Sequence, residues 1–335
     1  MCTNFRAKRS KDGSAVVGRS MEYPVGMPTG LGVLPKGYQG SAKAPAPADK
    51  RVEWTAAYGV VGMAAFGDAS SMSDGMNTAG VSAHLLYMPN GYCTYQSFVG
   101  DGEDISEMDL VAFVLGTCAS VSDVKACLAA LRVWGFDPGM GFAPPLHLLV
   151  HDRESAIAVE FRPEGLSIVD NPTGVGTNAP WMDWMLVNLN NYVGIGATVP
   201  ASVDAVGLHF AQFGQGAGLR GLPGDYTGPS RFVRAATMVA LSDQPATSRD
   251  AEMQVLHILN AFDIPAGLVR EEANGQLVDE VTVWITISNL QDLRYSFRTV
   301  GDPTVYAIDL SSVDFTAPPR TLEMSWAGGF TPFHA

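Results

Sequence analysis

The amino-acid sequence predicts an α+β fold in which antiparallel β-sheets are stacked between outer helices, as a four-layer αββα sandwich. Three observations support this class. Strand patterns dominate both ends of the chain, blocks of helical pattern lie between them, and an alternating apolar and polar stretch separates those blocks. The 335 residues are 47% apolar and 16% charged, which suffices for a large core, so we expect residues 1–335 to form a single domain.

The chain is predicted to begin with a hairpin. Residues 3–7 and 14–21 have strand patterns, and Asp12-Gly13 between them supplies the positive φ that a tight turn needs. The Gly- and Pro-rich residues 24–50 lack periodicity, which predicts a long loop that could border a pocket.

Two helices are predicted between residues 104 and 136, with Ser106 and Ser122 as N-caps and Gly135 after the second. Residues 145–171 alternate apolar and polar side chains across Asp and Gly turns, which predicts an antiparallel meander. Further helices are expected at 180–192, 230–241 and 251–262, and further strands at 279–289 and 293–300. This order places the helices outside the sheets.

The composition disfavours several classes of function. The 21 Lys and Arg against 34 Asp and Glu give a net charge of −13, which argues against a nucleic-acid binder. No window approaches the ~18 apolar residues of a membrane span, and the N-terminus shows no apolar leader, so we expect a cytoplasmic protein, with a periplasmic one as the alternative if a leader has been removed. The four cysteines show no CxxC pair, which favours reduced thiols. No phosphate-binding glycine loop is present, and we expect neither an organic cofactor nor a metal.

Cys2 is the most informative residue. Removal of an initiator Met is favoured before a small residue, and Cys2 would then carry a thiol nucleophile and a free α-amine on one residue. An unperturbed α-amine has a pKa of about 7.7–8.0, so it can accept the thiol proton and later return it to a leaving amine. The alternative is an incidental cysteine beside the start of the chain.

Other polar residues have both a functional and a structural interpretation. Arg19 and Glu22 follow the predicted hairpin back towards Cys2, where a cation would favour the thiolate, although each could form a surface ion pair. Asn178, extended before Pro180, either projects into a cleft or caps the helix that starts near Trp181. Arg231 is a candidate functional residue, but it could instead lie on a helix face that is exposed to solvent.

A pair of histidines suggests a competing site. His147 and His151 have the i, i+4 spacing of metal ligands on a helix, but their segment has a strand pattern, which favours ordinary strand histidines.

Five blocks in order resemble the choloylglycine hydrolases, the N-terminal-nucleophile (Ntn) amidases that include bile salt hydrolases and penicillin V acylases. They are MCTNF at 1–5, GRSMEY at 18–23, SDGMNTAGVSAHLLYMP at 73–89, TNAPWMDWMLVNLNNY at 177–192 and GLPGDYTGPSRFVRA at 221–235. The resemblance implies the Ntn-hydrolase fold and spans nearly the whole chain. It also implies a homotetramer, because residues 192–224 match a segment that is exchanged between subunits.

The resemblance implies a role for each matching position. Cys2 is the nucleophile, and Arg19 and Arg231 are active-site arginines. Asn178 supplies one oxyanion donor through its side-chain amide, and the main-chain N–H of Leu86 supplies the other. Glu22 departs from the pattern, because the family usually has Asp there.

The implied substrate is a linear, non-peptide amide. The apolar side chains of Met21, Tyr23, Met27 and Tyr87 near these blocks predict an apolar acyl pocket, and His84 is a candidate substrate contact. The aromatic residues at positions 23 and 87 are similar to those of the penicillin V acylase-like members, which implies a substrate with an aromatic or fatty acyl group. A conjugated bile salt hydrolase and an acyl-homoserine lactone acylase are the alternatives. An inactive binding protein of the same fold and a redox sensor are the rival classes.

Overall fold

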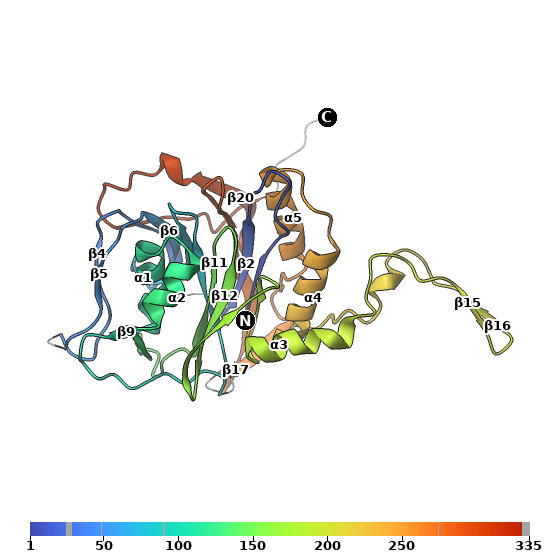
Figure 1. Cartoon of the computed structure of the whole chain (residues 1–335), viewed down its shortest axis with the longest axis horizontal. Helices are drawn as coiled ribbons and strands as arrows, with labels where there is room; N and C mark the ends of the chain where they lie inside the picture. Colours follow the sequence, from blue (N-terminus) through green and yellow to red (C-terminus); the bar gives the residue numbers. More distant parts are fainter. Residues whose placement is uncertain (25–28, 48, 90, 274, 330–335) are drawn as a thin grey trace.

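The computed structural model describes residues 1–24, 29–47, 49–89, 91–273 and 275–329. Two antiparallel sheets lie face to face, and each is covered by helices on its outer side, as Figure 1 shows. The predicted four-layer α+β class is therefore confirmed.

The first sheet has the strand order β14-β1-β2-β18-β19-β20, and β17 also pairs with β18. The bounds are β14 (Val175–Gly176), β1 (Cys2–Arg6), β2 (Val16–Tyr23), β18 (Gln276–Asn289), β19 (Arg294–Thr299), β20 (Asp302–Asp309) and β17 (Val269–Ala273). The first two strands of the chain lie side by side in the middle of this order, with Cys2 opposite Met21. The predicted N-terminal hairpin therefore carries Cys2 to the interior.

The second sheet has the order β13-β12-β11-β8-β7-β6-β3-β21. The bounds are β13 (Gly165–Asp170), β12 (Ala156–Arg162), β11 (Leu146–His151), β8 (Ser82–Tyr87), β7 (Met72–Asn77), β6 (Val60–Ala65), β3 (Thr29–Leu34) and β21 (Arg320–Leu322). Strands β11, β12 and β13 form the predicted meander.

The helices α1 (Leu110–Thr117) and α2 (Val121–Leu128) cover the second sheet, and α3 (Met182–Asn188), α4 (Gly228–Leu241) and α5 (Ser248–Asn260) lie on the side of the first (Figure 1). Short 3₁₀ turns span Glu107–Asp109, Leu189–Tyr192, Ala217–Leu219 and Leu310–Ser312. Three small sheets pair β4 (Gln39–Ser41) with β5 (Glu53–Thr55), β9 (Asp104–Ser106) with β10 (Arg132–Trp134), and β15 (Val203–Ala205) with β16 (Leu208–Phe210).

Three apolar clusters fill the spaces between the four layers. One joins α1 and α2 to the second sheet, a second joins α4 and α5 to the first sheet, and a third lies between the sheets around Trp284 and Met63. Burial of these side chains is the main force that holds the layers together. In the part of the chain that the structure describes, no helix is long and apolar enough to cross a membrane.

The expected loop at 24–50 is wrong in part, because it contains β3 and β4. Glycines at alternate positions hide the strand pattern of β3. A Cβ atom at Gly32 would come within 2.9 Å of the Ala69 carbonyl oxygen, and one at Gly30 would clash with Thr321. The close approach of neighbouring chain segments therefore requires residues that weaken the sequence signal for a strand.

The second helix predicted before residue 136 is too long. Helix α2 ends at Leu128, and Arg132–Trp134 is strand β10. Its N-cap is Ser120 rather than Ser122, because the Ser120 hydroxyl accepts the Asp123 N–H at 3.1 Å. Ser106 is an N-cap, but of the 3₁₀ turn Glu107–Asp109, and the N-cap of α1 itself is Asp109.

Glu107 yields a prediction about stability. Its carboxylate accepts the Phe136 N–H at 2.8 Å and lies beside the Ser106 hydroxyl, and burial raises its pKa to about 7. The folded-state pKa exceeds the unfolded value, so its stabilising contribution is complete below about pH 4 and is lost as the pH rises through 7.

The difference in unfolding free energy between Glu107→Gln and the parent should therefore shift in favour of the variant by up to about 3 kcal/mol as the pH rises from 4.5 to 8. Urea unfolding at several pH values measures this. The exposed Glu103 provides the control Glu103→Gln, which should show no such pH dependence. An equal effect of Glu107→Gln at both pH values would refute the assignment.

Candidate active site

The hairpin of β1 and β2 brings Cys2, Arg19 and Met21 together. Cys2 is 2% exposed, and its Sγ lies 3.6 Å from Arg19 Nη2 and 3.5 Å from Met21 Sδ. A guanidinium at this distance stabilises negative charge on the sulfur. The predicted pairing of a cation with the thiol is present, and the alternative of a surface ion pair is wrong for Arg19, which is fully buried.

A buried network holds the Arg19 side chain. Arg19 pairs with Asp74 of β7, whose other carboxylate oxygen accepts the Tyr295 hydroxyl of β19, and Arg19 Nη2 donates to the Leu85 carbonyl at 2.8 Å. Burial acts to lower the pKa of Arg19, but Asp74 and Cys2 outweigh it, so the net pKa is raised. The guanidinium therefore stays charged and fixed beside the thiol.

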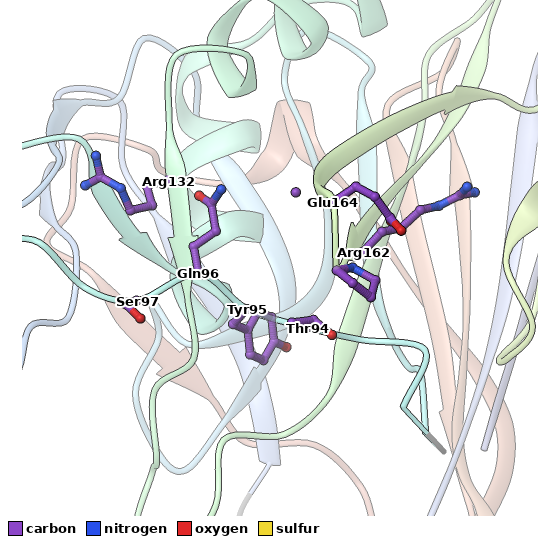
Figure 2. A pocket seen from close by; sticks show the side chains of 9 residues that line it. Thr94, Tyr95, Gln96, Ser97, Arg132, Arg162 and Glu164 are labelled. Carbon is purple, nitrogen blue, oxygen red and sulfur yellow. The ribbon is translucent and has the colours of Figure 1, made fainter.

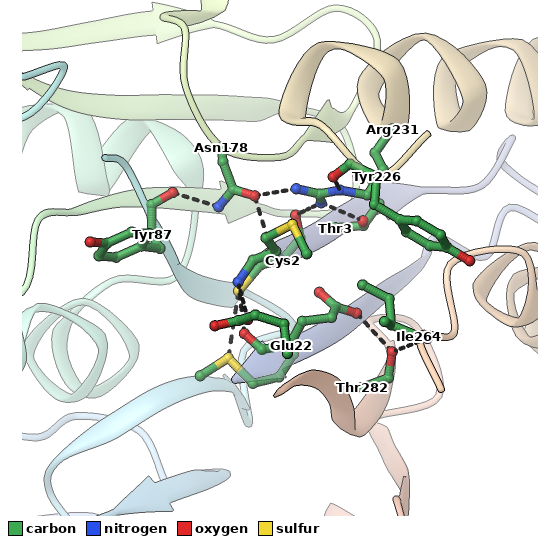
Figure 3. Close-up of polar contacts among 12 residues, drawn as sticks. Cys2, Thr3, Glu22, Tyr87, Asn178, Tyr226, Arg231, Ile264 and Thr282 are labelled. Carbon is green, nitrogen blue, oxygen red and sulfur yellow. Dashed lines mark hydrogen bonds and ion pairs between the residues drawn. The ribbon is translucent and has the colours of Figure 1, made fainter. Parts of the chain in front are cut away.

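Asn178 and Arg231 also contact Cys2, as Figure 3 shows. Asn178 follows β14, and its Oδ1 accepts the Cys2 N–H at 3.1 Å. Arg231 of α4 donates to the Cys2 carbonyl, to Asn178 Oδ1 and to the Thr3 hydroxyl at 2.9 Å. The helix-cap alternative for Asn178 is wrong because Trp181 is the N-cap of α3.

The solvated-face alternative for Arg231 is also wrong. This side chain is 1% exposed, and burial lowers its pKa. Arg231 therefore fixes the main chain at Cys2 rather than facing water.

Glu22 lies one position beyond Met21 on β2 and is buried. Its Oε1 accepts the Thr282 hydroxyl at 3.2 Å, while its Oε2 has no hydrogen-bond partner among the described residues. Burial raises the pKa of Glu22, and Arg231 and the N-terminal amine oppose that rise. The longer side chain of Glu22 thus reaches β18, and one oxygen remains able to accept a proton donor.

The expected oxyanion donor Leu86 does not face the nucleophile. The Met88 N–H donates to the Pro145 carbonyl, so these two opposite residues form a hydrogen-bonded pair between β8 and β11. Leu86 lies opposite His147, two residues from that pair along each strand. Leu86 and His147 are therefore a hydrogen-bonded pair, and the Leu86 N–H is used inside the sheet. The adjacent Tyr87 peptide faces the site, because its carbonyl accepts Asn178 Nδ2 (Figure 3).

The histidines at 147 and 151 each have a hydrogen-bond partner within the fold. His147 Nε2 lies 3.0 Å from the Thr177 carbonyl, and His151 Nε2 lies 2.6 Å from Asn4 Oδ1. Burial lowers the pKa of His147 to about 4, so the ring is neutral and donates Nε2–H to that carbonyl. His147 is thus a positioning residue for the peptide that precedes Asn178.

We expect His147→Phe to lower kcat about tenfold with little change in KM, because Asn178 loses the support of its neighbouring carbonyl. His147→Gln, which keeps a donor, should restore part of the rate. Steady-state kinetics of both variants measure this. Equal rates for the Phe and Gln variants would contradict the positioning role.

The candidate substrate contacts are distributed unevenly. Met21 touches the thiol, Tyr23 on β2 is half-buried, and Tyr87 at the end of β8 is exposed. His84 is fully buried, with its ring 5.9 Å from that of His151, and its contact with a substrate stays a prediction. Met27 lies outside the described residues.

Other clusters lie apart from these residues. A pocket of about 410 Å³, shown in Figure 2, is lined by Arg132, Arg162 and Glu164 with Thr94 to Ser97, and includes no residue of the Cys2 site. Arg132 pairs with Asp101 and Asp104 there. Within the described ranges, no group of three or more His, Cys, Asp or Glu side chains is arranged to hold a metal ion.

Sequence reasoning missed Asp74, Tyr295 and the role of His147. Asp74 lies in the block 73–89, and the presence of an acidic residue in that block was the sequence signal that could have identified it. Tyr295 gave none, because only the stacking of the two sheets brings β19 to β7.

Comparisons with known proteins match this architecture. The profile of linear amide C–N hydrolases, choloylglycine hydrolase family, matches residues 2–320. A bile salt hydrolase/transferase of Lactiplantibacillus plantarum is 31% identical over 257 residues, covering 76% of this chain and 78% of the relative.

Two further comparisons differ in strength. The crystal structure of the C2A mutant of conjugated bile acid hydrolase from Clostridium perfringens superposes with a TM-score of 0.87 at 26% identity, covering 100% of both chains. A penicillin V acylase of Pectobacterium atrosepticum is 23% identical, covering 90% of this chain and 78% of the relative.

Proposed function

Because the chain belongs to the choloylglycine hydrolase family of linear amide C–N hydrolases, we propose that it cleaves an N-acyl amide by attack of the Cys2 thiolate. The observation that carries this proposal is the enclosure of Cys2, whose sulfur faces Arg19 and whose nitrogen faces Asn178. The Cys2 nitrogen becomes a base only when it is no longer a peptide nitrogen. The proposal therefore requires removal of Met1.

The reaction has two stages that share one base. The α-amine of Cys2 takes the thiol proton, and the thiolate attacks the amide carbonyl carbon. The tetrahedral intermediate collapses, the C–N bond breaks, and the ammonium of Cys2 returns its proton to the leaving amine. Water then attacks the thioester while the α-amine again accepts a proton, which releases the carboxylic acid and regenerates the thiol.

Two donors would stabilise the oxyanion. Asn178 Nδ2 carries a second N–H beside the one bound to the Tyr87 carbonyl. The Tyr87 N–H lies on the same side of β8 as that carbonyl, so it replaces Leu86 as the main-chain donor. We propose that Glu22 Oε2, which is buried without a hydrogen-bond partner among the described residues, accepts a hydrogen bond from the freed α-ammonium.

The acyl group we assign is a bulky bile-acid type, rather than the phenoxyacetyl or fatty group favoured by the aromatic residues at 23 and 87. The higher identity to a bile salt hydrolase than to a penicillin V acylase supports this ranking. Acid release from glycocholate, penicillin V and a long-chain acyl-homoserine lactone tests it, with Cys2→Ala as the control. No release from any of them by a chain that lacks Met1 would favour an inactive binding protein.

The oligomer we propose is a homotetramer assembled through the arm at residues 193–221, which projects from the body in Figure 1. Its hairpin and flanking loop expose large apolar side chains, namely Val203, Val206, Leu208, Phe210 and Phe213. Such a surface is typical of a protein–protein interface.

We expect Phe210→Asp combined with Phe213→Asp to reduce the mass in solution from that of a tetramer, as measured by light scattering. Val99 is also exposed but lies outside the arm, so Val99→Asp is the matched control. A monomeric parent protein would overturn the proposal.

A further inference from the structure

We propose that the position held by Met1 becomes, after its removal, a subsite for the amine half of the substrate that favours a cationic leaving group over an anionic one. This inference rests on the proposed function, because it takes attack by Cys2 as given. It concerns the leaving group only, and it holds for any acyl group.

The mechanism fixes where the leaving group lies. The α-amine of Cys2 must hand its proton to the leaving nitrogen, so the two nitrogens lie within hydrogen-bond distance. Met1 is bonded to that same Cys2 nitrogen. Substituents on the leaving nitrogen therefore extend into the space that Met1 occupies in the unprocessed chain.

The main chain of Glu22 lines this space. Met1 continues β1 by one residue: its carbonyl accepts the Glu22 N–H at 2.9 Å, and its amine donates to the Glu22 carbonyl at 2.8 Å. Once Met1 is gone, Glu22 presents one free donor and one free acceptor at a strand edge. A substrate amine or amide can pair with both groups as Met1 does.

Glu280 of β18 determines the charge preference. Its Oε2 lies 3.2 Å from the Met1 ammonium, and its side chain is only 8% exposed. The ammonium is thus a cation already seated in the site, held by one carboxylate and one carbonyl. Removal of Met1 leaves this carboxylate without its cation, so it favours another cation or a strong donor.

Neighbouring groups reinforce this preference. Val269 of β17 lies opposite Glu280 of β18, so their side chains project from the same face of the hairpin. Glu271, two residues after Val269, projects from that face as well. Glu280 raises the pKa of the partly buried Tyr23 after the larger effect of burial, and burial, Glu271 and Glu280 together raise that of Tyr87. The rings of Tyr23 and Tyr87 and the carboxylates of Glu271 and Glu280 are the kinds of groups that typically bind an ammonium ion.

The two arginines of the site do not counter these carboxylates. Arg19 is directed at Asp74 and the Leu85 carbonyl, and Arg231 is directed at Cys2, Thr3 and Asn178. Both guanidinium groups are fully buried. A leaving group with a carboxylate or sulfonate would therefore meet Glu280 without a cation directed towards it.

Three amides with one acyl group test this inference. The cholyl amides of ethylenediamine, ethanolamine and glycine have leaving groups of similar size that are cationic, neutral and anionic. We expect kcat/KM to fall in that order, and Glu280→Gln to reduce the ratio of the cationic to the anionic amide about tenfold or more. Glu272→Gln is the control, since Glu272 lies on the neighbouring strand β17 and projects from the opposite face of the hairpin.

Binding to the Cys2→Ala protein without Met1, measured by calorimetry, separates this inference from the proposed function. Tighter binding of the cationic amide, lost in Glu280→Gln, supports the subsite even if no amide is hydrolysed, and that lack of hydrolysis would overturn the proposed function alone. Equal or reversed affinities would overturn the subsite. A uniform change in rate for all three amides in Glu280→Gln would also overturn it, because Glu280 would then act on the α-amine of Cys2.

Discussion

A chain in which Cys2 is preceded by an uncleaved residue is expected to lose about 10²–10⁴-fold in kcat/KM, the usual contribution of a general base. In that chain the Cys2 nitrogen is an amide, which cannot accept the thiol proton. Met1 also fills the space beside Glu22 and Glu280 that the leaving amine needs. The two effects act on the same step.

A removable N-terminal extension provides the measurement. A tag whose protease leaves Cys2 as the first residue allows the same preparation to be assayed before and after cleavage. We expect activity to appear only after cleavage, in proportion to the fraction of chains that begin at Cys2 by intact mass. Full activity of the tagged chain would show that the α-amine is not the base.

Replacement of Asn178 has the second largest expected effect. Asn178→Ala removes an oxyanion donor and should lower kcat about 10²–10³-fold with little change in KM, because the lost interaction forms only in the transition state. The change also deprives the Cys2 nitrogen and Arg231 of a shared acceptor. Steady-state kinetics on the best substrate measure the effect.

The alkylation rate of Cys2 by iodoacetamide distinguishes this role from a general loss of the site. Alkylation needs the thiolate but no oxyanion hole, so Asn178→Ala should be alkylated nearly as fast as the parent. Asn190→Ala makes the same change on an exposed residue nearby and should leave both rates unaltered. A parallel fall of kcat and alkylation would mean that Asn178 acts on the thiol instead.

Local sequence signals predicted the elements that hold the nucleophile. Asp12-Gly13 marked the turn that places Cys2 opposite Met21, and Pro180 marked the extended segment from which Asn178 reaches Cys2. These signals are reliable because Gly and Pro act through the conformation of one or two residues. The helix starts near 182, 228 and 248 were likewise close to prediction.

The sequence could not predict which strand face each residue takes. A one-residue error in alignment exchanges Leu86 for Tyr87, and with it a group inside the sheet for one that faces the nucleophile. Nor could it join Arg19, Asp74 and Tyr295, which come from three strands in two sheets. Such contacts depend on how the two sheets stack, and no fixed spacing of residues along the sequence indicates that stacking.

The most direct test of the central claim, attack by the thiol of an N-terminal Cys2, is to trap the acyl-enzyme. The protein is mixed with its best substrate, quenched in acid within the first turnover and digested with pepsin in acid, because at neutral pH an acyl group on the thiol of an N-terminal cysteine shifts to the α-amine. We predict that the N-terminal peptide lacks Met1 and carries the acyl group as a thioester on Cys2. An acyl group on another residue, or turnover by chains that retain Met1, would contradict it.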